Sequence, residues 1–202
     1  MQRSIWFALA VAGLVGGLAA SASADDRYRP IPSGPGQTGQ LELRVMQYDK
    51  GVYGEMTVEI HNRGAQPASF SASGLYFTPD DDPDSAPQRL AIVGGVRTGS
   101  EEAPRAGVAL AGDATLRIRF DVYCIDEDRD APESDTPFTL ARSRMPPRLI
   151  AALEASTRDV VKTIKLKPDD DQRRQLQPLV WQARRSAPAK LVGDGAQERG
   201  KY

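Results

Sequence analysis

Residues Thr115–Tyr123 read TLRIRFDVY, and this stretch decides the fold class. Apolar side chains occupy every second position, at Leu116, Ile118, Phe120 and Val122. An alternation with a period of two is typical of a strand that buries one face and leaves the other polar. The stretch therefore predicts a half-buried β-strand.

Further strand patterns precede this one along the chain. Two of them alternate as clearly, and three are shorter or weaker: residues 41–45 and 56–60, then Ala68–Ser73, Leu75–Thr78 and Leu90–Val93. Glycine and proline stand in the gaps between them, as expected for turns. Several short strands separated by turn signals predict a mainly β fold, an antiparallel sandwich.

The last third of the chain has a helical pattern. Pro146-Pro147 can open a helix, because the fixed φ of proline suits the first turn. Apolar residues then follow at helical spacing until Pro168 stops the helix. A second, shorter helix is predicted from Pro178 through Arg185, with Pro178 at its first position. We expect both helices to pack on the sheet, which would bury their apolar faces.

Composition excludes several classes of protein. The 202-residue chain has a net charge of −1, one Cys and one His. A nucleic-acid partner is not expected without a basic surface, and neither a disulfide framework nor a two-His metal site can form. No cofactor motif or nucleophile–base set is visible, so a non-enzymatic protein is predicted. An enzyme that uses a carboxylate pair is the less favoured alternative.

The N-terminal segment resembles an export signal. Arg3 precedes an apolar run that ends at Ala22-Ser23-Ala24, a small-x-small cleavage site. This pattern predicts a signal peptide over 1–24, and hence a periplasmic or secreted protein with no membrane span after cleavage. A flexible leader over 25–40, one domain over 41–186 and a polar tail over 187–202 complete the expected organisation.

Two acidic runs have the 1-3-5 spacing of a calcium loop. They are Asp80, Asp82 and Asp84, and Asp126, Asp128 and Asp130. Both lack the glycine at position six and the glutamate at position twelve that an EF-hand loop requires. A solvated loop is therefore the favoured interpretation, no metal site is assigned, and Asp80, Asp82 and Asp84 are kept as weak calcium candidates.

Cys124 directly follows the strongest strand. It has the parity of Val122 and Phe120, so its side chain should point into the core. An unpaired thiol in an exported protein is exposed to oxidation unless it is shielded. A shielded core thiol, an intermolecular disulfide and another internal bond all stay open. Trp181 leaves two interpretations as well, a packing residue or part of a binding face.

Two segments carry a resemblance to known families. VYCID at residues 122–126 resembles the Tyr-Cys-Ile segment of bacterial thioester domains, found in surface adhesins. QPLVW at residues 177–181 resembles their Gln-x-Ala-Ile-Trp motif in the spacing of Gln and Trp, with Leu179 in place of Ala. The segments VEIHN at 58–62 and GLYFTP at 74–79 resemble Ig-like modules of secreted bacterial proteins.

The resemblance implies a specific chemistry. Cys124 would attack the side-chain amide of Gln177, expel ammonia and form an internal thioester that a partner amine can open. The leading prediction is nevertheless a non-enzymatic binding module with an Ig-like sandwich. It would act at the cell envelope or outside the cell, on an unknown protein or surface ligand. Covalent attachment through the candidate thioester Cys124–Gln177 is the alternative.

Overall fold

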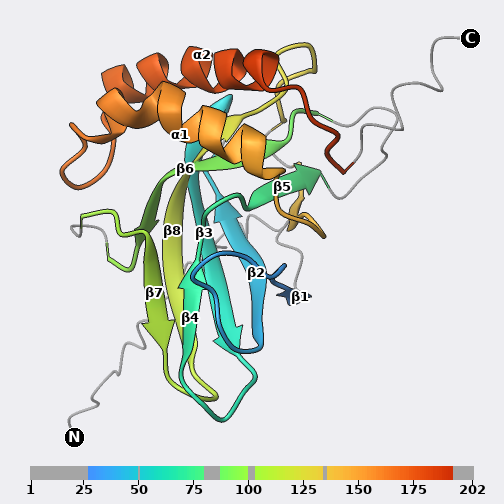
Figure 1. The fold of residues 1–202 in the computed structure, drawn as a ribbon, viewed down its shortest axis with the longest axis vertical. Helices are drawn as coiled ribbons and strands as arrows, with labels where there is room; N and C mark the ends of the chain where they lie inside the picture. The colour runs from blue at the N-terminus through green and yellow to red at the C-terminus, as the bar shows by residue number, and fades with distance from the viewer. Residues whose placement is uncertain (1–26, 50, 80–86, 100–102, 134–135, 193–202) are drawn as a thin grey trace, which may run out of the picture.

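The computed structural model describes residues 27–49, 51–79, 87–99, 103–133 and 136–192 (Figure 1). Nine strands precede two helices along the chain: β1 (Arg29–Pro30), β2 (Leu41–Tyr48), β3 (Tyr53–Asn62), β4 (Ala68–Ser71), β5 (Tyr76–Pro79), β6 (Leu90–Arg97), β7 (Gly107–Leu110), β8 (Thr115–Cys124), β9 (Phe138–Leu140), α1 (Pro147–Val161) and α2 (Asp170–Ser186). The mainly β fold with C-terminal helices is therefore confirmed.

Seven strands form one antiparallel sheet in the order β1-β2-β3-β8-β6-β5-β9, and β4 pairs with β7 in a second, two-stranded sheet. β8 lies at the centre of the large sheet between β3 and β6. The large sheet curls until β9 contacts β2, so its shape is nearly that of a barrel. The antiparallel arrangement is confirmed, whereas the Ig-like sandwich stays a prediction.

The large sheet is buried on its inner face along its whole length. The alternating residues of β2, β3 and β8 meet the side chains of β4 and β9 there, with Phe70, Phe77 and Phe120 in ring contact. Burying a large apolar side chain stabilises a fold by roughly 1.5–3 kcal/mol. This inner core is the one that the strand periodicity predicts.

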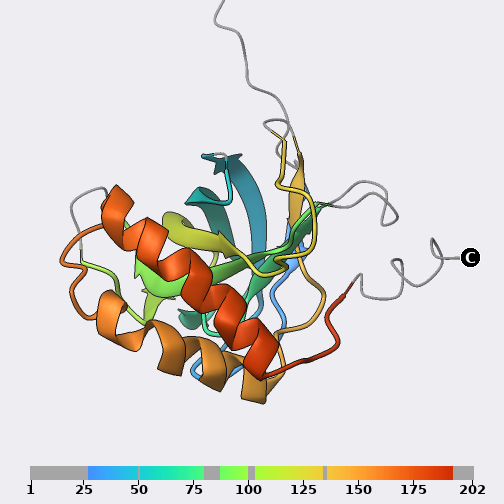
Figure 2. The same ribbon diagram turned by 90° about the horizontal axis from the view of Figure 1, so that it is seen from above.

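A second core lies on the outer face of the same sheet. The helices α1 and α2 lie side by side across one end of the sheet (Figure 2). They cover Tyr123 at the end of β8 and Ile125 just beyond it, together with Val93 from β6 and Tyr76 from β5. The last five residues of β8 are consequently all buried, while its first half keeps a more exposed outer face.

The predicted start of the second helix is wrong. α2 begins at Asp170, because Asp169 and Gln172 form a capping box in which each side chain bonds the backbone of the other residue. Pro178 lies inside the helix rather than at its first position. Pro178 lies on the exposed face of α2, where water can hydrogen-bond the Arg174 carbonyl that the missing proline N–H leaves without a donor.

Ordered contacts extend beyond both predicted domain boundaries. In the leader, β1 pairs with β2, and Arg144 donates hydrogen bonds to the carbonyls of Pro32 and Ser33 at 2.9 and 3.1 Å. In the predicted tail, Leu191 is buried against the helices. The predicted signal peptide, residues 1–24, lies outside the described residues. Neither described helix has the length and apolar character needed to cross a membrane.

Candidate functional site

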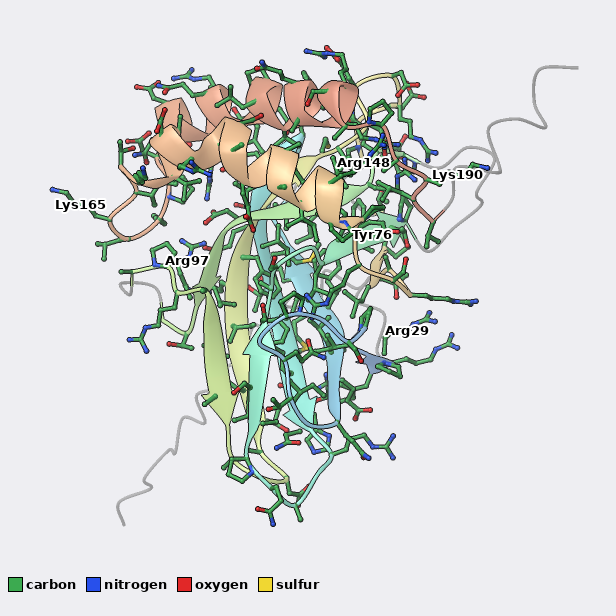
Figure 3. The ribbon with its side chains drawn as sticks, viewed as in Figure 1. Arg29, Tyr76, Arg97, Arg148, Lys165 and Lys190 are labelled. Carbon is green, nitrogen blue, oxygen red and sulfur yellow. The ribbon has the colours of Figure 1, made fainter. Side chains whose placement is uncertain are left out.

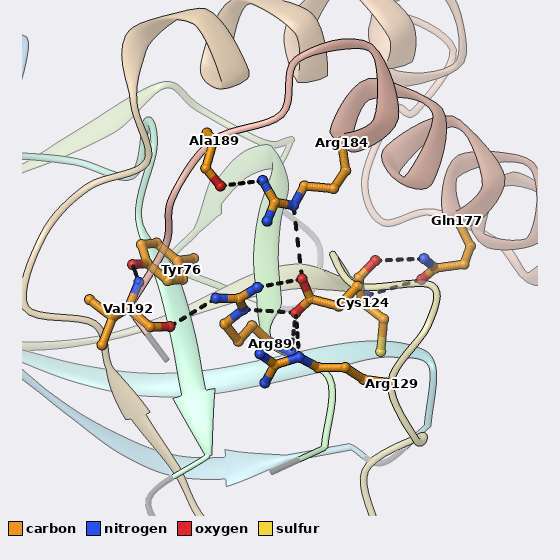
Figure 4. Close-up of polar contacts among 9 residues, drawn as sticks. Tyr76, Arg89, Cys124, Arg129, Gln177, Arg184, Ala189 and Val192 are labelled. Carbon is orange, nitrogen blue, oxygen red and sulfur yellow. Dashed lines mark hydrogen bonds and ion pairs between the residues drawn. The ribbon is translucent and has the colours of Figure 1, made fainter. Parts of the chain in front are cut away.

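Cys124 and Gln177, the predicted thioester pair, lie next to each other. Cys124 ends β8, and Gln177 projects from the middle of α2 (Figure 4). The Gln177 Nε2 donates to the Cys124 carbonyl at 2.8 Å, and its Oε1 accepts from the Cys124 N–H at 3.1 Å. Both residues are buried. The side-chain amide thus ties the helix to the end of the strand.

The Cys124 thiol points away from this contact. The side chain belongs to the inner core with Val122 and Phe120, whereas Gln177 approaches from the helices on the outer face. Figure 4 shows the sulfur turned away from the Gln177 amide. Burial, and to a lesser degree the charge of Asp126, raises the pKa of the thiol to about 12. A thiol that stays protonated is a poor nucleophile.

Just beyond β8, the carboxylate of Asp126 is surrounded by three arginines. Arg89 donates two hydrogen bonds to it, from Nε to Oδ2 at 2.7 Å and from Nη2 to Oδ1 at 2.5 Å. The Nε atoms of Arg129 and Arg184 each lie 3.9 Å from a carboxylate oxygen. The side chains of Arg89 and Asp126 are only 2% and 4% exposed, so this is a buried ion cluster.

Strand pairing and helix packing bring these residues together. Arg89 stands just before β6 and Asp126 just after β8, next to the Leu90–Cys124 pair of that antiparallel ladder. Arg184 comes from the last turn of α2. The chain after α2 is bound to the same cluster, since the carbonyl of Ala189 accepts from Arg184 at 2.6 Å and that of Val192 from Arg89 at 2.9 Å.

An open cleft of about 780 Å³ adjoins this ion cluster. We call it the arginine cleft, and it lies between the end of β8, the last turns of α2 and the segment that follows. Its lining residues are Arg89, Ile125, Asp126, Glu127, Asp128, Arg129, Trp181, Arg184, Arg185, Pro188, Ala189 and Lys190. Five of them are basic and three acidic, so the cleft has a positive balance that favours an anion.

Trp181 supplies an aromatic wall to the arginine cleft. Its indole Nε1–H is buried and has no hydrogen-bond partner within the part of the chain that the structure describes. An indole N–H can only donate, and a buried donor without an acceptor costs free energy. Trp181 is half-buried in the lining of the cleft, and both interpretations of the sequence, a packing residue and part of a binding face, stay open.

A second buried ion cluster lies at the other end of α2, around Asp121 of β8. Arg97 reaches its carboxylate at 2.9 Å and Arg173 at 3.3 Å, and Arg97 also contacts Glu55 at 3.0 Å. Burial raises the pKa of Asp121, although the two arginines counteract it. The hydroxyl of Tyr123 beside this cluster has no hydrogen-bond partner among the described residues.

The acidic runs do not form a metal site in the described part of the chain. Asp80, Asp82 and Asp84, the weak calcium candidates, lie outside the described residues. Asp126 is engaged by arginines, and no group of three or more His, Cys, Asp or Glu converges among residues that are described. His61 lies on a strand with its Nδ1 3.1 Å from the Glu42 carboxylate.

The sequence carries no signal that singles out the arginines of the cleft. Arg89, Arg129 and Arg184 are spread over almost a hundred residues and show no common spacing. Their convergence depends on the β6–β8 register and on the position of α2, which the pattern of single segments does not contain. No family model, curated protein or solved structure matches this chain.

Proposed function

We propose that this chain is an exported, non-enzymatic binding module of the Ig-like sandwich type, acting at the cell envelope or outside the cell, and that it binds a small organic anion in the arginine cleft. The observation that carries the proposal is the combination of a basic lining with an aromatic wall whose N–H has no acceptor among the described residues. Pockets of this size commonly take a small molecule.

The cleft offers one surface for each half of such a ligand. Guanidinium and ammonium groups at Arg184, Arg185 and Lys190 suit a carboxylate, sulfonate or phosphonate, because arginine presents several donors in a fixed plane. Arg185 also pairs with Glu127, so a ligand anion would share or replace that contact. The indole of Trp181 and the ring of Pro188 suit a flat apolar group. Asp126 holds Arg89 in place, so part of the site is arranged before the ligand arrives.

Isothermal titration calorimetry with phenylphosphonate tests the proposal. Benzyl alcohol and benzylamine are matched probes that keep the ring and replace the anion by a neutral or cationic group. We expect saturable binding of the anion only. The double variant Arg185→Gln/Lys190→Gln should weaken it by about three- to tenfold, which is the usual size of two exposed charge contacts. Lys165→Gln/Lys167→Gln removes the same charge outside the cleft and should leave the affinity unchanged.

Two results would overturn the proposal. One is equal binding of all three probes, because charge would then play no part. The other is equal weakening by the two double variants, because the effect would then come from net charge rather than from the cleft.

The thioester is the second candidate, favoured by the contact between Cys124 and Gln177. Its formation requires the thiol to turn from the inner core toward the Gln177 amide. The intact mass of the purified chain distinguishes the two states, since thioester formation expels one ammonia. A full sequence mass, with a thiol that alkylates only after unfolding, would eliminate this candidate. A mass lower by one ammonia would establish it, if methylamine then adds to Gln177 as an N-methyl amide and frees the Cys124 thiol for alkylation.

A further inference from the structure

A second hollow, of about 390 Å³, lies between α1 and β6. Its floor is formed by Val93 from β6 and by Met145 and Leu153 from the start and middle of the α1 region. Ile92 and Ile150 add to its walls. We call this hollow the α1 groove. It is separate from the arginine cleft, with which it shares no lining residue.

Two consecutive glycines keep the α1 groove open. β6 has a register shift between Val93 and Val96, and Gly94 and Gly95 fill the bulge with φ of +92° and +120°. No heavy atom lies within 4 Å of the point where a Cβ on Gly94 would stand. A Cβ on Gly95 would come within 2.6 Å of the Arg105 carbonyl oxygen. The bulge therefore needs glycine, and it leaves space where a regular strand would place side chains.

The apolar lining of the α1 groove is aliphatic. It consists of valine, isoleucine, leucine, alanine and methionine side chains, and it contains no aromatic ring. Met145 adds a flexible thioether that adapts to irregular ligand shapes. Such a surface suits a flexible hydrocarbon chain better than a flat ring, in contrast to the arginine cleft with its tryptophan.

The rim of the α1 groove is positively charged. Arg158, in the last turn of α1, and Lys162, at its C-cap, stand one helical turn apart and line the groove while remaining exposed. Glu154 is the one carboxylate among the lining residues. A ligand with a hydrocarbon chain in the groove would therefore meet two cations and one anion where it emerges, which favours a negatively charged head group.

We propose that the α1 groove binds a single unbranched acyl chain with an anionic head group, the chain lying against Val93 and Leu153 and the head group near Arg158 and Lys162. This site is additional to the arginine cleft. The proposal rests on the hollow, its aliphatic lining and the charge of its rim, and it does not depend on the function of the cleft.

Calorimetric titration of the wild-type chain with dodecanoate, below its micelle concentration, tests the proposal. We expect saturable binding that weakens by up to about fourfold for each methylene removed, so that octanoate binds far more weakly. Dodecyltrimethylammonium carries the same chain with a cationic head group, and we expect it to bind at least about tenfold more weakly than dodecanoate. Saturating phenylphosphonate should not displace dodecanoate.

Two variants locate the site. Ala106→Trp places a large side chain into the open side of the groove from an exposed position, and it should abolish binding of dodecanoate. Arg158→Glu/Lys162→Glu should weaken binding about tenfold. The matched control Lys165→Glu/Lys167→Glu makes the same charge change outside the lining and should change it less than about twofold.

Three results would overturn the proposal. The cationic amphiphile could bind as well as dodecanoate, which would leave no role for the rim. Ala106→Trp could bind dodecanoate normally while its unfolding transition matches that of the wild type, which would place the chain elsewhere. The protein could bind anionic phosphatidylglycerol vesicles but not free dodecanoate, which would indicate association with a membrane surface instead.

Discussion

The two ends of α2 contain the same kind of chemistry in different surroundings. At its first turn, Arg173 reaches Asp121 of β8, and at its last turn, Arg184 approaches Asp126 just beyond the same strand. Both aspartates are buried and both are paired with a second, almost fully buried arginine, Arg97 or Arg89. Figure 3 shows the labelled Arg97 and Lys190 on opposite sides of the molecule, Arg97 at the left and Lys190 at the right.

The two clusters differ in how many arginines surround the aspartate and in whether solvent can reach the cluster. Asp121 shares Arg97 with Glu55, and its own ionisation is opposed by burial. Asp126 faces three arginines and borders the open arginine cleft. We infer that the first cluster fixes the helix to the sheet, whereas the second also leaves a positively charged surface for a ligand.

The largest expected effect separates the two aspartates. Asp126→Asn should destabilise the fold by about 3–5 kcal/mol, because it removes the carboxylate that compensates the buried charge of Arg89. Asp121→Asn should cost less than about 1 kcal/mol at neutral pH, because burial already disfavours its charge and Glu55 still pairs with Arg97. Urea unfolding of both variants measures the two values, and equal losses would remove the distinction between the clusters.

The contact halfway between the two ends should have the next largest effect. Gln177→Ala removes both hydrogen bonds to the Cys124 backbone in a buried position, and we expect a loss of about 2–3 kcal/mol. Gln182→Ala, on the exposed side of the same helix, is the matched control and should change stability by less than about 0.5 kcal/mol. Since alanine has a higher helix propensity than glutamine, propensity cannot cause a loss, and a similar loss in both variants would mean that the Cys124 contact is not its source.

Removing one tyrosine hydroxyl near each ion cluster should change the stability of the fold in opposite directions. Tyr76→Phe should lose about 1 kcal/mol, because the Tyr76 hydroxyl accepts a hydrogen bond from the Val192 N–H at 2.9 Å near the arginine cleft. Tyr123→Phe should be neutral or gain up to about 1 kcal/mol, because its buried hydroxyl has no hydrogen-bond partner in the described chain. Thermal unfolding in one buffer compares them, and a clear loss for Tyr123→Phe would show that its hydroxyl is satisfied.

The smallest effect concerns pH. Burial raises the pKa of Asp121 above its ordinary value of 3.8, so ionisation of Asp121 opposes folding and protonation favours it. The wild type should therefore gain stability relative to Asp121→Asn as the pH falls through the raised pKa toward 3.8. Urea unfolding of both proteins over this pH range gives the difference in their free energies of unfolding. If the wild type instead becomes less stable relative to Asp121→Asn on acidification, the pKa of Asp121 is lowered in the folded protein rather than raised.

The strand periodicity predicts the inner core, but it predicts the burial pattern of only the first half of β8. Leu116, Ile118 and Phe120 point inward as expected. Asp121 belongs to the face predicted to be polar and exposed, yet it is buried, since the helices cover that end of the sheet. Which part of a strand a distant helix covers is decided by tertiary packing, and no periodicity within the strand can report it.

The sequence predicts some features of the candidate site and not others. The proximity of Cys124 and Gln177 was proposed from a resemblance, and the structure places the two residues in contact. The direction of the thiol follows from strand parity, which sends it to the inner core. β9 cannot be predicted from the sequence, because its three residues are too few for an alternating pattern. The capping residues Asp169 and Gln172 were the available signal for the true start of α2.

The central claim is that the arginine cleft binds an organic anion, and Trp181 reports on it directly. Trp6 and Trp181 are the two tryptophans of the sequence, so a chain without the predicted signal peptide keeps Trp181 alone. Phenylphosphonate should change its fluorescence along a saturable curve, while benzyl alcohol at the same concentrations should not. A fluorescence that stays constant with phenylphosphonate, or changes equally with both compounds, would contradict the claim.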